Sequence, residues 1–227
     1  MATFVLIHGA GDSAWYWHLV APELRNGGHD VVAVDLPCDD DSAGLNEYAD
    51  AVVDAVAERK HLVVVAQSFG GFTAPLVCER LPVELMILVA AMIPAPGEAP
   101  NDYWVGTGYG AVGSEAGDEG GAAAEGESTN ATFHHDVPPD VAAEAMSRER
   151  EQSSARMDEP WPLKTWPDVA TRFLLCRDDR LFPAEWLRRV VRERLGITPD
   201  EIDSGHCVAL SLPTELADRL HAYASSP

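Results

Sequence analysis

Short apolar segments alternate with helix-like segments along most of this chain, and this alternation restricts the possible folds more than any other feature. Five continuous runs rich in Val, Leu and Ile cover residues 3–7, 31–34, 61–66, 84–90 and 171–176. Such runs are typical of strands that are buried on both faces of a parallel sheet. A sixth strand is expected near Glu201-Ile202-Asp203. The pattern predicts an α/β fold with a doubly wound, mostly parallel sheet of about six strands.

Helices are expected between most of these strands. The predicted helical segments are residues 15–26, 45–59, about 69–81, 183–195 and 212–224. In the second segment, apolar residues at a spacing of three and four would form a stripe that packs on the sheet. Pro75 falls inside the third segment and removes the hydrogen bond to the carbonyl of Gly71, so we expect a kink or irregular first turns there.

One stretch departs from this alternation of strands and helices. After the strand at 84–90, residues 94–166 become rich in Gly, Ala, Glu and Pro and then turn helical around 140–152. We expect an insertion over the carboxyl edge of the sheet, with a flexible Gly/Glu-rich loop followed by a small helical cap. Plain disorder is an equally open account of residues 113–127. The predicted organisation is a single structural domain with a core of 1–93 and 167–227 and a cap of 94–166.

The composition excludes several classes of partner. A chain of 227 residues is long enough for one α/β domain and short for two. Its formal net charge of −21 disfavours nucleic acid and anionic membranes, whose phosphates require clustered Lys and Arg. No apolar run reaches the roughly 18 to 20 residues of a membrane span. The four scattered cysteines and the absence of a leader-like start predict a reduced, cytoplasmic protein, whose oligomeric state stays open.

The run Val63–Gly71 carries the first sign of chemistry. An apolar strand leads into Ala66-Gln67-Ser68-Phe69-Gly70, which has the small-x-Ser-x-small pattern of a serine presented on a sharp turn between a strand and a helix. Alanine at position 66 departs from the commoner glycine. Alone, this motif fits a structural Ser/Gly turn as well as a nucleophile.

The other groups that a serine nucleophile requires are present at strand ends. His206 follows the last expected strand and can act as the base, while Asp178 and Asp179 follow the strand at 171–176 and compete to orient it. The turn His8-Gly9-Ala10-Gly11 follows the first strand. We expect the amides of Ala10 and Phe69 to form an oxyanion hole, and His8 to hold the turn in place.

Several runs of the chain resemble one known family. They are Phe4-Val5-Leu6-Ile7-His8-Gly9-Ala10, Ala14-Trp15-Tyr16-Trp17, Gly28-His29-Asp30-Val31 and Val34-Asp35-Leu36. With the serine motif, they resemble the α/β-hydrolase superfamily, and within it the plant methyl-esterase and hydroxynitrile-lyase group and its small bacterial relatives. The resemblance covers roughly residues 3–93 and 167–224 and fades in the insertion.

The resemblance implies the α/β-hydrolase fold and a serine hydrolase of the carboxylesterase type. Its triad would be Ser68, Asp179 and His206, because the family places the acid four residues before a proline, here Pro183. It further implies an acyl-enzyme, a small-molecule ester as substrate, no metal or organic cofactor, and a pocket between core and cap.

Four alternatives are weighed against this hypothesis. The lyases carry threonine and lysine where this chain has Gly9 and Cys207, which disfavours cyanide chemistry. Ser68 excludes the dehalogenases, which use an aspartate. A ligand-binding protein without catalysis, suggested by Ala66 and by the unusual cap, stays open, as does C–C bond cleavage or lactone hydrolysis on the same triad.

The remaining candidate residues have more ordinary interpretations. His134-His135-Asp136 could suggest a metal site, but a cap-loop or pocket-lining role is the better interpretation. Cys207 is expected to pack behind the triad. Six aromatic residues could line an apolar pocket or belong to the core: Trp15, Trp17, Phe72, Tyr103, Trp104 and Trp161.

Overall fold

The computed structural model describes residues 1–110 and 127–225. Within these ranges, one six-stranded sheet has the order β2-β1-β3-β4-β5-β6, and all neighbouring strands are parallel. The strands are β1 (Thr3–Ile7), β2 (Asp30–Val34), β3 (Leu62–Gln67), β4 (Val83–Val89), β5 (Thr171–Cys176) and β6 (Asp200–Ile202). The predicted doubly wound α/β fold is confirmed, and each strand lies within one residue of its predicted bounds.

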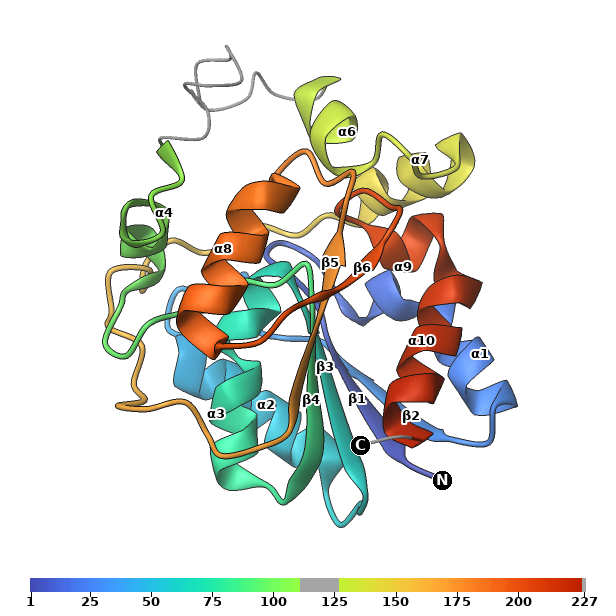
Figure 1. Cartoon of the computed structure of the whole chain (residues 1–227), viewed down its shortest axis with the longest axis horizontal. Helices are drawn as coiled ribbons and strands as arrows, with labels where there is room; N and C mark the ends of the chain where they lie inside the picture. The colour runs from blue at the N-terminus through green and yellow to red at the C-terminus, as the bar shows by residue number, and fades with distance from the viewer. Residues whose placement is uncertain (111–126, 226–227) are drawn as a thin grey trace.

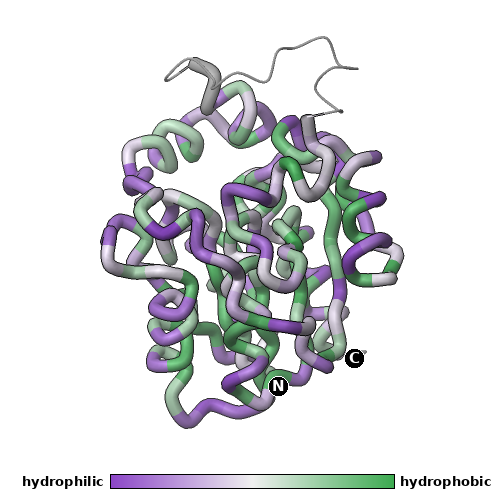
Figure 2. Tube along the Cα trace, turned by 90° about the vertical axis from the view of Figure 1, so that its left-hand side faces the viewer, coloured by the Kyte–Doolittle hydropathy of each residue, from purple (hydrophilic) through white to green (hydrophobic). Residues whose placement is uncertain are grey.

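Helices cover both faces of the sheet (Figure 1). One face carries α2 (Leu45–Val56), α3 (Ala74–Arg80) and α8 (Ala184–Leu195), and the other carries α1 (Val20–Asn26), α9 (Val208–Ser211) and α10 (Pro213–Ser225). Side chains alternate along a strand, so Val5 and Ile7 pack in the first layer, whereas Phe4 and Leu6 pack in the second. Figure 2 shows the hydrophobic strands inside and hydrophilic residues mainly outside.

Prolines divide two of the predicted helices. The segment 15–26 consists of a 3₁₀ turn, η1 (Ala14–Trp17), and then α1, whose first turn contains Pro22. Proline lacks the N–H that would continue a helix from residue 18, but it is tolerated in a first turn. The segment 69–81 likewise consists of a 3₁₀ turn, η2 (Ser68–Phe72), and α3, with Pro75 in its first turn. The irregular start predicted from Pro75 is confirmed.

Further short helices lie between β4 and β5 in the sequence. They are η3 (Pro100–Asp102), α4 (Tyr103–Gly106), α6 (Glu127–Phe133) and α7 (Pro139–Arg148). In Figure 1, α6 and α7 lie beyond the carboxyl ends of the strands. Most of the predicted Gly/Glu-rich loop, residues 113–126, falls outside the described residues. The division into a core and a cap stays a prediction.

The four cysteines are all free thiols, and Cys38, Cys176 and Cys207 are buried. Among the described helices, none combines the length and the hydropathy that a membrane span requires. A cytoplasmic location stays a prediction.

Candidate active site

Ser68 occupies a strained turn at the carboxyl end of β3. The strand ends at Gln67 and η2 begins at Ser68, whose φ of 51° lies in the left-handed region. For a residue with a β-carbon such a conformation costs about 1 to 3 kcal/mol, and strain of this kind clusters at functional sites. The turn also requires Gly71, because a β-carbon there would overlap the carbonyl oxygen of Met92. The sequence therefore holds Ser68 in a conformation that presents its side chain at the sheet edge.

Asp179 and His206 form a buried pair. The carboxylate Oδ2 lies 2.7 Å from Nδ1 of the imidazole. Its other oxygen, Oδ1, accepts hydrogen bonds from the amides of Leu181 at 2.8 Å and Phe182 at 2.9 Å. Both side chains are almost fully buried, whereas Asp178 is exposed. The backbone thus fixes one carboxylate oxygen and leaves the other to orient the imidazole.

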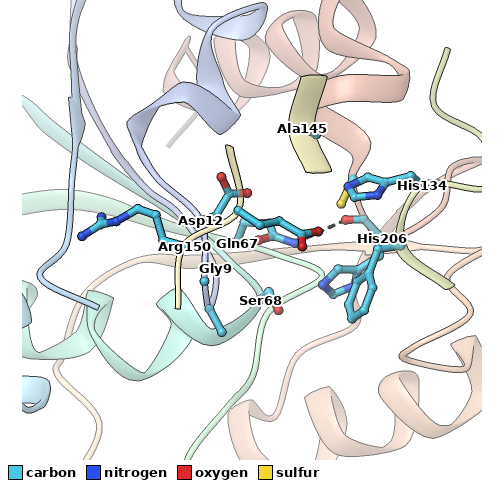
Figure 3. A pocket seen from close by; sticks show the side chains of 13 residues that line it. Gly9, Asp12, Gln67, Ser68, His134, Ala145, Arg150 and His206 are labelled. Atoms are coloured by element: carbon cyan, nitrogen blue, oxygen red, sulfur yellow. Dashed lines mark hydrogen bonds between the residues drawn. The ribbon is translucent and has the colours of Figure 1, made fainter. Parts of the chain in front are cut away.

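His206 and Ser68 line the same cavity, in which the imidazole lies beside the serine (Figure 3). Phe133 and Phe182 each form a T-shaped pair with the imidazole, with ring centroids 5.4 and 5.1 Å away. Within the described residues no hydrogen bond joins Ser68 Oγ to the ring. In enzymes without substrate this contact is often long and tightens in the complex.

The expected oxyanion donors, Ala10 and Phe69, line a second cavity together with Ser68. Phe69 lies in the first turn of η2, where backbone N–H groups have no acceptor within the helix. His8 holds the other donor turn: its Nδ1 lies 2.7 Å from the carbonyl oxygen of Gly9, and its Nε2 accepts the amide of Leu36 at 3.0 Å. Burial lowers the pKa of His8 to about 4, so its ring is neutral and holds the turn in place, as expected.

Gln67 fills the space above Gly9, a role that the sequence did not reveal. A β-carbon on Gly9 would lie 2.5 Å from Oε1 of Gln67 and 3.0 Å from Cβ of Ser68. The amide Nε2 of Gln67 donates to the carbonyl oxygen of His206 at 3.3 Å. The threonine that marks the lyases at this position would therefore have to displace Gln67.

Asp136 supports the loop that carries His206. Its Oδ2 accepts hydrogen bonds from the amide of Gly205 at 2.6 Å and from Oγ of Ser204 at 3.1 Å. The neighbouring His135 donates through Nε2 to the carbonyl of Asp178 at 3.0 Å. Among the described residues, no cluster of three His, Cys, Asp or Glu side chains could hold a metal ion. The sequence suggested a general loop role for this stretch but not these contacts.

Two cavities meet at Ser68, and both are lined by Ala10, Ser68 and Phe133. The first has a volume of about 240 Å³, and besides Ser68 its polar side chains are Asp12, Gln67, His134, Glu149, Arg150 and His206. The second has a volume of about 300 Å³ and is lined mainly by Met92, Trp104, Phe133, Met157, Leu181 and Phe182. Of the six aromatic residues considered from the sequence, Trp104 lines this cavity, while Trp17, Phe72, Tyr103 and Trp161 are core residues.

Residues 4–219 match the model of the alpha/beta hydrolase family. The chain belongs to this family. The predicted resemblance to plant esterases is also confirmed. Over 107 residues the chain is 38% identical to the probable esterase PIR7A of Oryza sativa subsp. indica, covering 42% of this chain and 41% of the relative. It is 30% identical over 112 residues to the polyneuridine aldehyde esterase of Rauvolfia serpentina, again covering 42% and 41%. The matched region thus spans about two fifths of these relatives' lengths.

Solved structures agree on the alpha/beta hydrolase fold over the whole chain. The crystal structure of polyneuridine aldehyde esterase superposes with a TM-score of 0.80 at 20% identity, covering 99% of both chains. A pyrethroid hydrolase from Sphingobium faniae JZ-2 superposes with a TM-score of 0.79 at 22% identity, covering 100% of this chain and 98% of the other. At these identities the likeness establishes the fold.

The first cavity of this alpha/beta hydrolase is electrostatically unusual. Burial, followed by the nearby charges of Glu149 and Asp35, raises the pKa of Asp12 to about 6. Burial also raises the pKa of Glu149. His134 has its pKa lowered, first by burial and then by the neighbouring His206. The cavity therefore holds carboxylates that are incompletely solvated beside a neutral imidazole.

Asp12→Asn should stabilise the protein at neutral pH. The folded-state pKa of about 6 exceeds the ordinary value of 3.8, so ionising Asp12 costs stability as the pH rises through this window. Asparagine keeps the acceptor for the amide of Ser13, which Oδ1 of Asp12 binds at 2.8 Å. We expect a gain of about 1 to 3 kcal/mol in urea unfolding at pH 7.5 that vanishes near pH 4. Asp54→Asn, on the exposed face of α2, is the control, and an equal gain there would refute the cavity explanation.

Proposed function

We propose that this protein is a carboxylesterase that cleaves small esters through an acyl-enzyme on Ser68. The observation that carries the proposal is the buried Asp179–His206 pair, 2.7 Å apart, beside a serine in left-handed conformation at the meeting point of two cavities. Nucleophilic serines require a base, and that base requires a group that fixes its orientation. The similarity to plant esterases supports an ester as the substrate.

Each group has a defined part in the proposed reaction. His206 takes the proton from Ser68 as Oγ attacks the carbonyl carbon, and Asp179 stabilises the resulting imidazolium. The amides of Ala10 and Phe69 bind the oxyanion. As the C–O bond breaks, His206 returns the proton to the leaving alcohol. Water, activated by His206, then attacks the acyl-enzyme and releases the acid and free Ser68.

The alternative of a ligand-binding protein without catalysis rests on Ala66 and on the unusual cap. In the structure, Ala66 is fully buried within β3 as part of the core. Its methyl group therefore lies within the packed sheet and gives no reason for Ser68 to be inert. Lactone hydrolysis and C–C bond cleavage would use the same three side chains, and product analysis over a panel of esters, thioesters and lactones separates them from ester cleavage.

Labelling with a fluorophosphonate probe tests the proposal directly. An activated serine displaces fluoride from phosphorus and remains covalently bound, whereas an ordinary serine hydroxyl does not react. We expect about one adduct per chain, located on Ser68 by peptide mass spectrometry, and loss of labelling in His206→Ala. If the folded protein does not react, the esterase proposal is wrong and the ligand-binding alternative is favoured.

A further inference from the structure

The two cavities at Ser68 differ sharply in chemistry. The second is lined mainly by Met, Trp, Phe and Leu side chains, with uncharged polar residues from Asn101 and the stretch 152–154, so it suits an apolar group. The first presents two carboxylates, Asp12 and Glu149, together with His134. An ester held with its carbonyl at Ser68 would extend one arm into each cavity.

The position of His206 assigns the two arms. In the proposed reaction His206 must protonate the alkoxide as the C–O bond breaks, so the leaving oxygen lies next to its ring. Among the described residues, His206 lines the first cavity and is absent from the lining of the second. Phe69, the expected oxyanion donor in η2, lines the second cavity. The alcohol arm therefore belongs in the first, polar cavity and the acyl arm in the apolar one.

The charges of the first cavity are unevenly compensated. Arg150 is the cation of its lining, but its guanidinium donates to Asp39 Oδ1 at 2.5 Å and to the carbonyl of Leu36 at 2.9 Å. In Figure 3 the Arg150 side chain runs away from Ser68 and His206. The side chain of Asp12 accepts a hydrogen bond from the amide of Ser13, and Glu149 lies exposed at the cavity. The cavity thus faces its occupant with negative charge.

His134 provides an independent sign of a ligand. Its side chain lines the first cavity, the residue is only 8% exposed, and its Nδ1 has no hydrogen-bond partner among the described residues. Figure 3 places it above His206 and across the cavity from Asp12. A buried polar atom without a partner carries a desolvation cost, and a catalytic role or a bound water or ion is the usual explanation for such a group. As a neutral imidazole, His134 adds no positive charge that would repel a cation.

From these observations we propose that the substrates are esters of an apolar carboxylic acid with an amino alcohol, whose cationic amine lies between Asp12 and Glu149. This proposal rests on the proposed esterase function. The reaction is the one given above: the C–O bond breaks, the amino alcohol leaves with the proton from His206, and water hydrolyses the acyl-enzyme. The cation stays on the leaving group throughout.

A matched pair of esters tests the proposal. Phenylacetylcholine and 3,3-dimethylbutyl phenylacetate share the acyl group and nearly the same alcohol shape, but only the first carries a charge. We expect kcat/KM to favour phenylacetylcholine at least tenfold, and the preference to shrink as ionic strength rises, because salt screens partly exposed charges. Asp12→Asn combined with Glu149→Gln should reduce the ratio at least fivefold, whereas Asp54→Asn should leave it unchanged.

The possible outcomes separate the two proposals. If the folded protein hydrolyses neither ester, the esterase function itself is wrong. If it hydrolyses both with a ratio near one, the esterase function stands and the amino-alcohol proposal is overturned. A tenfold preference that survives both carboxylate substitutions also overturns it, because the charge would then be recognised elsewhere. The ratio and its salt dependence in the unsubstituted protein give an answer even if the double variant does not fold.

Discussion

Turnover of p-nitrophenyl acetate falls by at least about 10⁴-fold when Ser68 is replaced by alanine. Removing the nucleophile leaves only binding and the oxyanion donors, and in other serine hydrolases such losses reach about 10⁶ in kcat. Alanine fits the same turn, because the left-handed conformation at φ 51° already accommodates a β-carbon. The fold should therefore persist, and circular dichroism together with the urea midpoint checks that it does.

Ser147→Ala is the matched control for this experiment. Ser147 lies exposed on α7, and its hydroxyl donates to the carbonyl of Glu144 at 2.7 Å, within the same helix. Ser147 lines neither cavity, so the same chemical change there should leave kcat within about twofold. Undiminished turnover in Ser68→Ala, measured on protein purified away from host esterases, would show that Ser68 is not the nucleophile.

The sheet could be predicted closely because buried parallel strands are continuous apolar runs. A strand whose two faces are both covered by helices must coincide with its apolar run, as at residues 171–176, so its bounds can be read from the sequence. Helix bounds were less certain, since local backbone chemistry decides them. The sequence predicts the irregular start at Pro75, but the helix predicted over 15–26 takes no account of Pro22, which divides that segment in the same way.

The candidate triad could be predicted because parallel strands place their carboxyl ends at one edge. Ser68, Asp179 and His206 follow different strands, and the topology alone brings such residues together. The choice of Asp179 over Asp178 came from family resemblance, and the structure supplies a physical reason: only Asp179 is buried against His206.

The polar cavity could not be predicted from the sequence. Asp12 comes from the turn after β1, whereas His134 and Glu149 come from the segment between β4 and β5. No periodic pattern in that segment shows how it lies against the sheet. Its position depends on individual hydrogen bonds, such as Arg150 N to Gly11 O at 2.7 Å, which have no signature in composition or spacing.

Asp179→Asn should reduce kcat by about 10⁴-fold while leaving the fold intact. Asparagine retains a carbonyl oxygen for the amides of Leu181 and Phe182, so the loop loses neither bond. Its amide group, however, replaces the carboxylate oxygen that lies 2.7 Å from Nδ1 of His206. An amide donor there favours the tautomer with the proton on Nε2, which cannot accept the serine proton. Burst kinetics with p-nitrophenyl acetate should show acylation slowed, with fluorophosphonate labelling slowed to a similar degree.

Asp178→Asn makes the same chemical change one residue earlier and separates the catalytic role from a general effect of loop charge. Asp178 is exposed, and its hydrogen bond with His135 uses the backbone carbonyl, which the substitution preserves. Its kcat should stay within about twofold. Equal losses in the two variants would mean that the loop's negative charge acts at long range rather than through a hydrogen bond to His206. A loss of kcat confined to Asp179→Asn would instead show that the hydrogen bond between Asp179 and His206 is needed. Both substitutions remove a carboxylate from the same loop, but only Asp179 is buried and contacts the imidazole.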